Sequence, residues 1–136
     1  MAERFFTTSL IEEQIQEIQK VMNFSTKAAV IRICISLSLL IEGNPKVGNE
    51  HILKDNSGMN YHRATIMGDD EEVYKVLFIQ HLGNHINDDE FFPTMFKAHL
   101  VRGMNSLYNY FKFNQNKEKM YVFLLEKLGG SNDISR

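Results

Sequence analysis

The longest apolar stretch of the chain runs from residue 28 to residue 41, where only Arg32, Ser36 and Ser38 are polar. Arg32 and Ser36 stand one helical turn apart, so they leave a single polar stripe on an otherwise apolar cylinder. The stretch is shorter than the ~20 residues that a membrane-spanning helix requires. It therefore predicts a buried core helix, in which the Arg32 guanidinium must find a carboxylate or backbone carbonyls because an unpaired buried charge is costly.

The residues that flank this stretch are typical of helix ends. Ser25 or Thr26 can cap the first turn, because a side-chain oxygen accepts a hydrogen bond from a free backbone N–H. Gly43 and Pro45 follow the apolar run, and both residue types interrupt helices. Cys34, in the middle of the run, is the only cysteine and is expected to be a buried thiol. A single cysteine forms no disulfide within the chain, which favours a reducing, cytoplasmic location.

A helix with a one-sided apolar stripe precedes the buried helix. The stripe recurs at intervals of four, three and four residues: Ile11, Ile15, Ile18 and Met22. Ser9 and Glu12 have the spacing of a capping box at its start. Residues 4–8, rich in aromatic residues and threonine, favour a short strand. The order of strand, amphipathic helix, turn and helix looks like a ribbon-helix-helix unit, in which two chains pair their strands.

The second half of the chain predicts three further helices. Acids at 69–72 suit the first turn of a helix, where they oppose the positive end of its dipole. Val73, Leu77 and His81 recur at intervals of four and mark its predicted buried side. Gly83 is the expected end of this helix.

The next predicted helix begins at Asp88 or Asp89, and Pro93 fits only in its first turn. One polar face is expected along this helix: Ala98, Arg102, Asn105, Asn109 and Lys112. Asn116 can cap the last helix, and four of its residues are expected to face inward: Met120, Phe123, Leu124 and Leu128.

Length and composition are those of one ordinary globular domain. The chain has 136 residues, of which 43% are hydrophobic and 24% charged. We expect a single, mostly α domain over residues 1–136, with an N-terminal ribbon-helix-helix-like unit followed by three further helices. Residues 43–60 are predicted to be irregular and residues 131–136 to form a loose tail.

Charge is unevenly distributed along the chain. The formal net charge is −2, yet no acid occurs between residues 91 and 117. A nearly neutral protein can therefore present one basic face. Of the many aromatic residues around this segment, we expect Tyr108 and Phe113 to be exposed and the others to be buried in the core or in a subunit interface.

Catalytic and cofactor motifs are missing from the sequence. It contains no phosphate-binding glycine loop, no paired CxxC and no zinc-protease motif, so we expect no cofactor. His81 and His85 have a metal-ligand spacing, but Gly83 lies between them, and we expect no metal site. The acidic clusters are explained as helix starts, which argues against a magnesium-dependent nuclease. The sequence therefore indicates a protein that is not an enzyme.

Two short motifs resemble a known family. They are YHRATIMGD at 61–69 and AHLVRGMNSL at 98–107, and together with the order of the first elements they resemble the DNA sulfur modification protein DndE family over residues 5–112. His62 departs from the family pattern, because it stands where asparagine is usual.

This resemblance implies a small, mostly helical homo-oligomer, a tetramer, that binds double-stranded DNA and prefers nicked duplex. It would be a non-catalytic scaffold in the complex that replaces a non-bridging phosphate oxygen by sulfur, alongside the other subunits of that complex. The DNA backbone contacts expected from this interpretation come from six cations: Arg63, Lys97, Arg102 and Lys112, with Lys20 and Lys27 as a second, weaker pair.

Two alternative functions stay open at this stage. A ribbon-helix-helix repressor would read bases with the strand at residues 4–8 in the major groove. A protein-only adaptor would hold an enzyme complex together without touching DNA.

Overall fold

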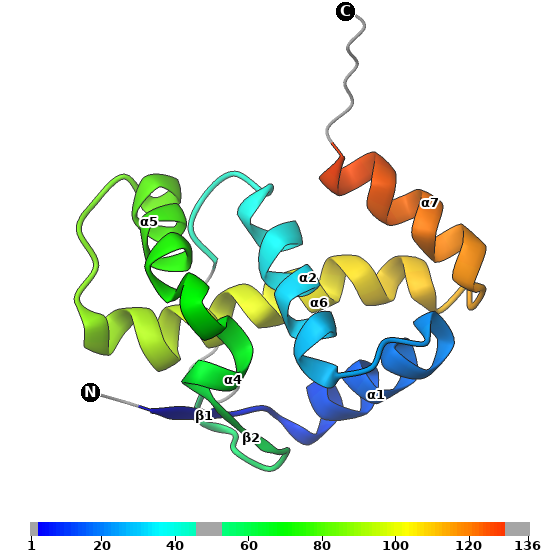
Figure 1. Ribbon diagram of the computed structural model, residues 1–136, viewed down its shortest axis with the longest axis horizontal. Coiled ribbons are helices and arrows are strands. Elements are labelled where there is room, and N and C mark those ends of the chain that lie inside the picture. The colour runs from blue at the N-terminus through cyan, green and yellow to red at the C-terminus, as the bar shows by residue number, and fades with distance from the viewer. Residues whose placement is uncertain (1–2, 46–52, 130–136) are drawn as a thin grey trace, which may run out of the picture.

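The structure is a computed structural model, which describes residues 3–45 and 53–129. It is mostly helical, with one small antiparallel sheet beside the helices (Figure 1). The elements follow in the order β1 (Arg4–Phe6), α1 (Ser9–Met22), α2 (Lys27–Leu39), β2 (Asn60–His62), α4 (Arg63–Met67), η1 (Gly68–Asp70), α5 (Glu71–Leu82), η2 (Glu90–Met95), α6 (Phe96–Phe111) and α7 (Lys117–Leu128). The predicted mostly α fold is confirmed, whereas part of the 43–60 segment and the 131–136 tail lie outside the described residues.

The first three elements have the predicted order of strand, helix and helix. β1 pairs antiparallel with β2 of the same chain, so that Phe5 lies opposite Tyr61. The predicted apolar stripe of α1 is buried, from Ile11 to Met22. The predicted capping box is wrong: Thr8 caps α1 by accepting a hydrogen bond from the Ile11 N–H at 3.0 Å.

α2 and α6 cross in the middle of the molecule. Thr26 caps α2, as predicted, and the Cys34 thiol is fully buried, which raises its pKa. Gly103 of α6 lies so close to α2 that a Cβ there would be 1.8 Å from the Cys34 carbonyl oxygen. Arg32 finds a carbonyl, as expected, because its Nη1 donates to Ile66 O at 2.8 Å.

A cluster of aromatic side chains packs where β1, α5, η2 and α6 meet. Its buried members are Phe5, Phe78, Phe91, Phe92 and Phe96. The prediction for the buried side of α5 is wrong, since Val73 and Leu77 are 56% and 41% exposed and Phe78 is fully buried. Phe78 packs into the aromatic cluster in place of Val73 and Leu77, because burying a phenyl ring removes more apolar surface from water than burying a valine or leucine side chain.

The helix predicted to begin at Asp88 or Asp89 is interrupted. Phe92, the residue before Pro93, has an extended backbone (φ −135°, ψ 119°) inside the π-helical segment η2. A residue before proline is disfavoured in the helical region, which explains the kink. The regular part of the helix, α6, begins only at Phe96.

The final helix, α7, starts as predicted, with Asn116 accepting a hydrogen bond from the Lys119 N–H at 3.0 Å. Met120 and Leu124 face the core, but Leu128 is 39% exposed and the prediction that it faces inward is wrong. The outer side of α7 carries further exposed apolar residues: Tyr121, Val122 and Leu125.

Candidate nucleic-acid interface

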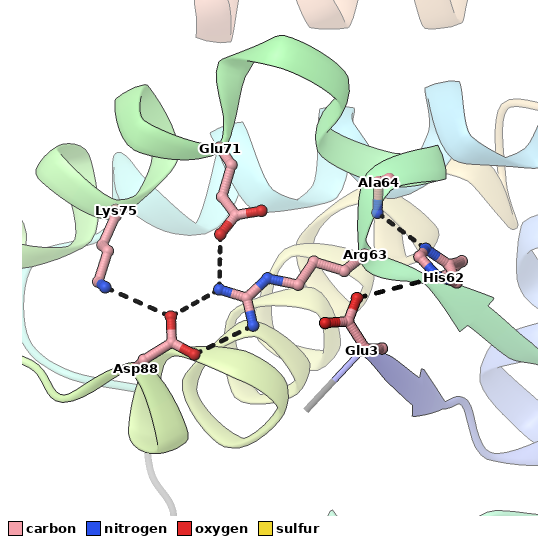
Figure 2. Close-up of polar contacts among 7 residues, drawn as sticks. All are labelled: Glu3, His62, Arg63, Ala64, Glu71, Lys75 and Asp88. Carbon is pink, nitrogen blue, oxygen red and sulfur yellow. Dashed lines mark hydrogen bonds and ion pairs between the residues drawn. The ribbon is translucent and has the colours of Figure 1, made fainter. Parts of the chain in front are cut away.

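The buried Arg63 is the centre of a partly buried ion-pair network where β2 passes into α4 (Figure 2). The preceding residue, His62, caps α4 by accepting a hydrogen bond from the Ala64 N–H at 3.2 Å. Arg63 Nη2 lies 2.6 Å from Glu71 Oε2 and 2.6 Å from Asp88 Oδ1, and Nη1 lies 3.2 Å from Asp88 Oδ2. The guanidinium therefore joins the start of α5 to the segment before η2.

The network stabilises the charged forms of Arg63 and Asp88. The Arg63 guanidinium lies over the Phe92 ring, 5.1 Å from the ring centroid. Lys75 Nζ lies 3.3 Å from Asp88 Oδ1, so two cations hold that carboxylate. The hydrogen bond from Arg63 lowers the pKa of Asp88 below its usual value. Since Arg63 is buried and bound by its own chain, we expect no DNA contact from it.

Lys97, another predicted DNA contact, is 3% exposed in the first turn of α6. Its ammonium donates to Leu53 O at 3.0 Å, to Asp55 O at 2.7 Å and to Asn56 Oδ1 at 3.4 Å. Three oxygens match the three donors of an ammonium group, and burial lowers the pKa of Lys97. The side chain fastens residues 53–56 to α6, and DNA phosphates have no access to its charge.

Arg102 performs a similar task at the end of α2. It donates to Ser38 Oγ and Ser38 O, both at 2.9 Å, to Gly43 O at 2.8 Å and to Ile41 O at 3.2 Å. Ser38 O lies in the last turn of α2, and Ile41 O and Gly43 O lie in the segment that follows, so Arg102 holds this segment against the end of the helix. The polar face that contains Arg102 therefore faces the end of α2 at this residue, where the guanidinium binds backbone carbonyls.

Lys27 is half-buried between the first two helices. Its Nζ lies 2.9 Å from Glu12 Oε2. Glu12 is itself buried and accepts hydrogen bonds from Tyr61 OH at 2.9 Å and Thr7 Oγ1 at 3.0 Å. Lys27 therefore neutralises a buried carboxylate, and we expect at most a weak DNA contact from it.

Lys20 and Lys112, the other two predicted contacts, are exposed. The Tyr108 OH donates to Glu17 Oε1 at 2.6 Å, which ties the C-terminal part of α6 to α1. Lys112 and Lys20 follow these two residues by about one turn, and both helices run toward the same end of the molecule (Figure 1). The fold thus brings the two exposed lysines to one end.

α7 begins at this same end and adds two exposed lysines (Figure 1). We name the four residues Lys20, Lys112, Lys117 and Lys119 the lysine end. Within residues 3–45 and 53–129, no ion pair involves any of them. The contacts predicted from the sequence leave out Lys117 and Lys119, because the pattern along the chain does not show that α7 begins beside the ends of α1 and α6.

The exposed aromatic residue of this end is Phe113. It is 79% exposed, as the sequence led us to expect, and Lys112 Nζ lies 5.5 Å from its ring centroid. Tyr108, also predicted to be exposed, is only partly so.

A second basic surface lies beside β1. A hollow of about 300 Å³ there is lined by the exposed cations Arg4 and Lys54 and by the buried Lys97, together with Phe5, Phe6, Leu53, Asn56 and Thr94. No acidic side chain is among the described residues that line this hollow. It was not predictable from the sequence, because Arg4 and Lys54 lie on segments that only the fold brings together.

Metal-ligand clusters do not form in the part of the chain that the structure describes: no three His, Cys, Asp or Glu side chains converge there. His81 Nε2 lies 2.8 Å from Ile41 O, in a hydrogen bond that links α5 to the end of α2. Among the described helices, none has the length and apolar character needed to cross a membrane.

Comparison with known proteins adds one finding. A family model described as "DNA sulphur modification protein DndE" matches residues 4–115. No individual curated protein is similar enough to count as a match. The matched region includes every element from β1 to α6 and ends before α7.

Proposed function

The chain belongs to the DndE family of DNA sulphur modification proteins, and from this premise we propose that it is a non-catalytic, DNA-binding scaffold of a phosphorothioate modification complex. In this role it binds double-stranded DNA, with a preference for nicked duplex, in the cytoplasm. The other subunits of the complex supply the sulfur and the chemistry.

The observation that carries this proposal is the lysine end. Four exposed ammonium groups on three helix ends suit a polyanion, because each can lie on a phosphate and release condensed counterions. Phosphate contacts carry no sequence information, so binding would depend on the shape or continuity of the strands. The hollow beside β1, with Arg4 and Lys54, is a second surface for the backbone.

Assembly would strengthen a weak single-chain surface. We propose a homo-oligomer, a tetramer, in which several lysine ends contact one duplex. Linked binding sites raise the overall affinity without any new contact, provided that they can reach the DNA together.

The test is binding of the purified protein to intact, nicked and single-stranded DNA of one sequence at several salt concentrations. Substituting all four lysines of the lysine end by alanine should weaken binding. It should also reduce the slope of log K against log salt by about 0.9 for each phosphate that is no longer neutralised. The control is Lys127→Ala, which removes an exposed lysine at the far end of α7.

Three outcomes would contradict the proposal in different ways. An unchanged slope in the fourfold variant would mean that DNA binds elsewhere, with the hollow beside β1 as the next surface to test. Absence of binding even at ~50 mM salt, where phosphate contacts are strongest, would favour a protein-only adaptor. Cleavage of the DNA would refute the non-catalytic role.

A further inference from the structure

Phe113 occupies a short, hydrogen-bonded turn between α6 and α7. Its N–H donates to Tyr110 O at 3.3 Å, and the Asn114 N–H donates to Phe111 O at 2.9 Å. The Asn114 side chain adds a bond from Nδ2 to Tyr110 O at 2.9 Å, and the Asn116 N–H donates to Asn114 O at 2.8 Å. These bonds fix the backbone on both sides of Phe113, so its ring is presented on a firm support.

The neighbouring aromatic residues do not cover this ring. Tyr110 stacks on Phe123 of α7, with centroids 4.4 Å apart and an angle of 17° between the ring planes. Phe111 is buried in the core. Local packing is therefore complete without Phe113, which is 79% exposed, the highest exposure among the large exposed hydrophobic residues of the described chain. A ring in this position contributes little to the fold and is free to contact a partner.

The charges around Phe113 indicate the chemistry of that partner. Lys112 precedes the ring in sequence and lies against it, and Lys117 and Lys119 follow in the first turn of α7. Glu118 is the only acid between residues 112 and 119. An apolar surface on a partner protein would not require these surrounding cations, whereas a nucleic acid offers phosphates for the lysines and a base for the phenyl ring.

An aromatic side chain can stack only on a base whose face is open. In an intact duplex every internal base is covered on both faces, but a nick, a gap or a duplex end can expose one. We propose that Phe113 stacks on the base exposed at a strand interruption while the lysine end holds the flanking phosphates. This assignment rests on the proposed DNA-binding function and names the residue that distinguishes broken from intact strands.

The first test compares Phe113→Ala with the unchanged protein on nicked and intact duplexes of one sequence, both with their ends closed by hairpin loops so that the nick is the only strand interruption. We expect the variant to lose about tenfold in affinity for the nicked duplex, the usual effect of removing one stacked ring. Affinity for the intact duplex and the salt dependence should stay the same, because the lysines remain. The matched control is Tyr121→Ala, which removes a half-exposed aromatic ring from the outer side of α7.

A second test uses a spectroscopic reporter. The sequence contains no tryptophan, so Phe113→Trp places a single indole at this position. Stacking on a base should quench its fluorescence more strongly with nicked than with intact DNA, and the variant should retain the preference for the nick.

The outcomes separate this inference from the proposed function. If the unchanged protein binds no DNA, both are refuted. If it binds nicked DNA preferentially and Phe113→Ala keeps the same ratio of affinities, only the role of Phe113 is refuted. Equal quenching of the Phe113→Trp variant by nicked and intact DNA would refute that role independently.

Discussion

Arg63 joins three segments of the chain through one guanidinium, and its replacement tests the importance of this junction. Arg63→Met keeps the apolar stem but leaves Glu71 and Asp88 facing each other without their common counter-charge. We expect a decrease of about 2 kcal/mol in the free energy of unfolding, less than for a fully buried pair, because both carboxylates are partly exposed and Asp88 keeps Lys75. Urea denaturation at neutral pH measures the change.

Two further variants make this prediction specific. Arg4→Met removes an exposed arginine and should change stability by less than about 0.5 kcal/mol. Asp88→Asn combined with Arg63→Met should cost less than the sum of the two single changes, because the residues share one interaction. Full additivity would show that the ion pair contributes nothing.

The buried His99 side chain makes the stability of the protein depend on pH. The imidazole is fully buried, and Nδ1 lies 2.8 Å from Ser38 Oγ, which in turn accepts from Arg102 Nε at 2.9 Å. Burial first, and then the charges of Arg102 and His81, lower the pKa of His99 from 6.5 to about 3. The unfolded chain therefore binds a proton between pH 6.5 and 3 that the folded chain does not bind.

The free energy of unfolding therefore loses nothing to His99 above pH 6.5, and it decreases as the pH falls toward 3. Between about pH 7 and about pH 5 the decrease should be about 2 kcal/mol, measured by urea denaturation at both values. His99→Gln should remove most of this difference, whereas His62→Gln, at a half-exposed site, should leave it unchanged. An equal pH dependence in the unchanged protein and in His99→Gln would refute the prediction.

The sequence identifies the cations of the predicted DNA-binding set, but it does not show which groups of the folded chain they bind. Lys97 and Arg102 lie on one predicted helix, yet their acceptors lie between 41 and 64 residues away along the chain. Periodicity identifies a face of a helix and carries no information about what packs on it. The sequence predicts Lys20 and Lys112 as DNA contacts, and both side chains are exposed.

At the scale of elements, the crossing of α2 and α6 depends on the missing side chain of Gly103. An alanine Cβ would lie 1.8 Å from Cys34 O and 2.8 Å from Cys34 Cα, so the two helices must separate. Gly103→Ala should destabilise the protein by about 3 kcal/mol, the upper range for overpacking a core. The sign is informative, because alanine in place of glycine usually stabilises a helix by about 1 kcal/mol.

Thermal unfolding of Gly103→Ala beside Asn105→Ala measures this effect. Asn105 is exposed on the same helix, so its replacement should change stability only slightly and in the stabilising direction. A rise in stability for Gly103→Ala would show that the helices do not approach so closely.

The buried side of α5 was not predictable from the sequence, because two different faces of this helix are apolar. Val73 and Leu77 are four residues apart, and so are Tyr74 and Phe78, so both pairs fit one face of a helix. The choice between them is made by the aromatic rings of η2 and α6, with Phe91 lying 5.1 Å from Phe78 between centroids. Those residues follow α5 in the sequence, and a pattern within the helix cannot show their position.

At the scale of the whole molecule, several large apolar side chains remain exposed on the described chain, and most of them belong to two surfaces. One joins α5 to the end of α2, where His81 contacts the Ile41 carbonyl: Val73, Val76, Leu77, Leu40 and Ile41. The other is the outer side of α7: Tyr121, Val122, Leu125 and Leu128. Exposed apolar surface of this kind is typical of protein interfaces. The family match ends at residue 115, so it includes the surface on α5 and α2 but not the one on α7, and we expect the proposed homo-oligomer to use the surface on α5 and α2.

Substitution of Val76 by lysine tests this assignment of the subunit interface. Val76 is 59% exposed, so a lysine there should leave the folded chain intact but place a charge in the centre of the contact. We expect Val76→Lys to reduce the mass in solution, measured by light scattering, to that of a smaller assembly. Leu125→Lys, the matched change on α7, should leave the mass unchanged. If Leu125→Lys alone dissociates the assembly, the subunit contact lies outside the region matched by the family model. The subunits would then be joined through α7, the helix that begins beside Phe113, and their lysine ends would lie near this contact.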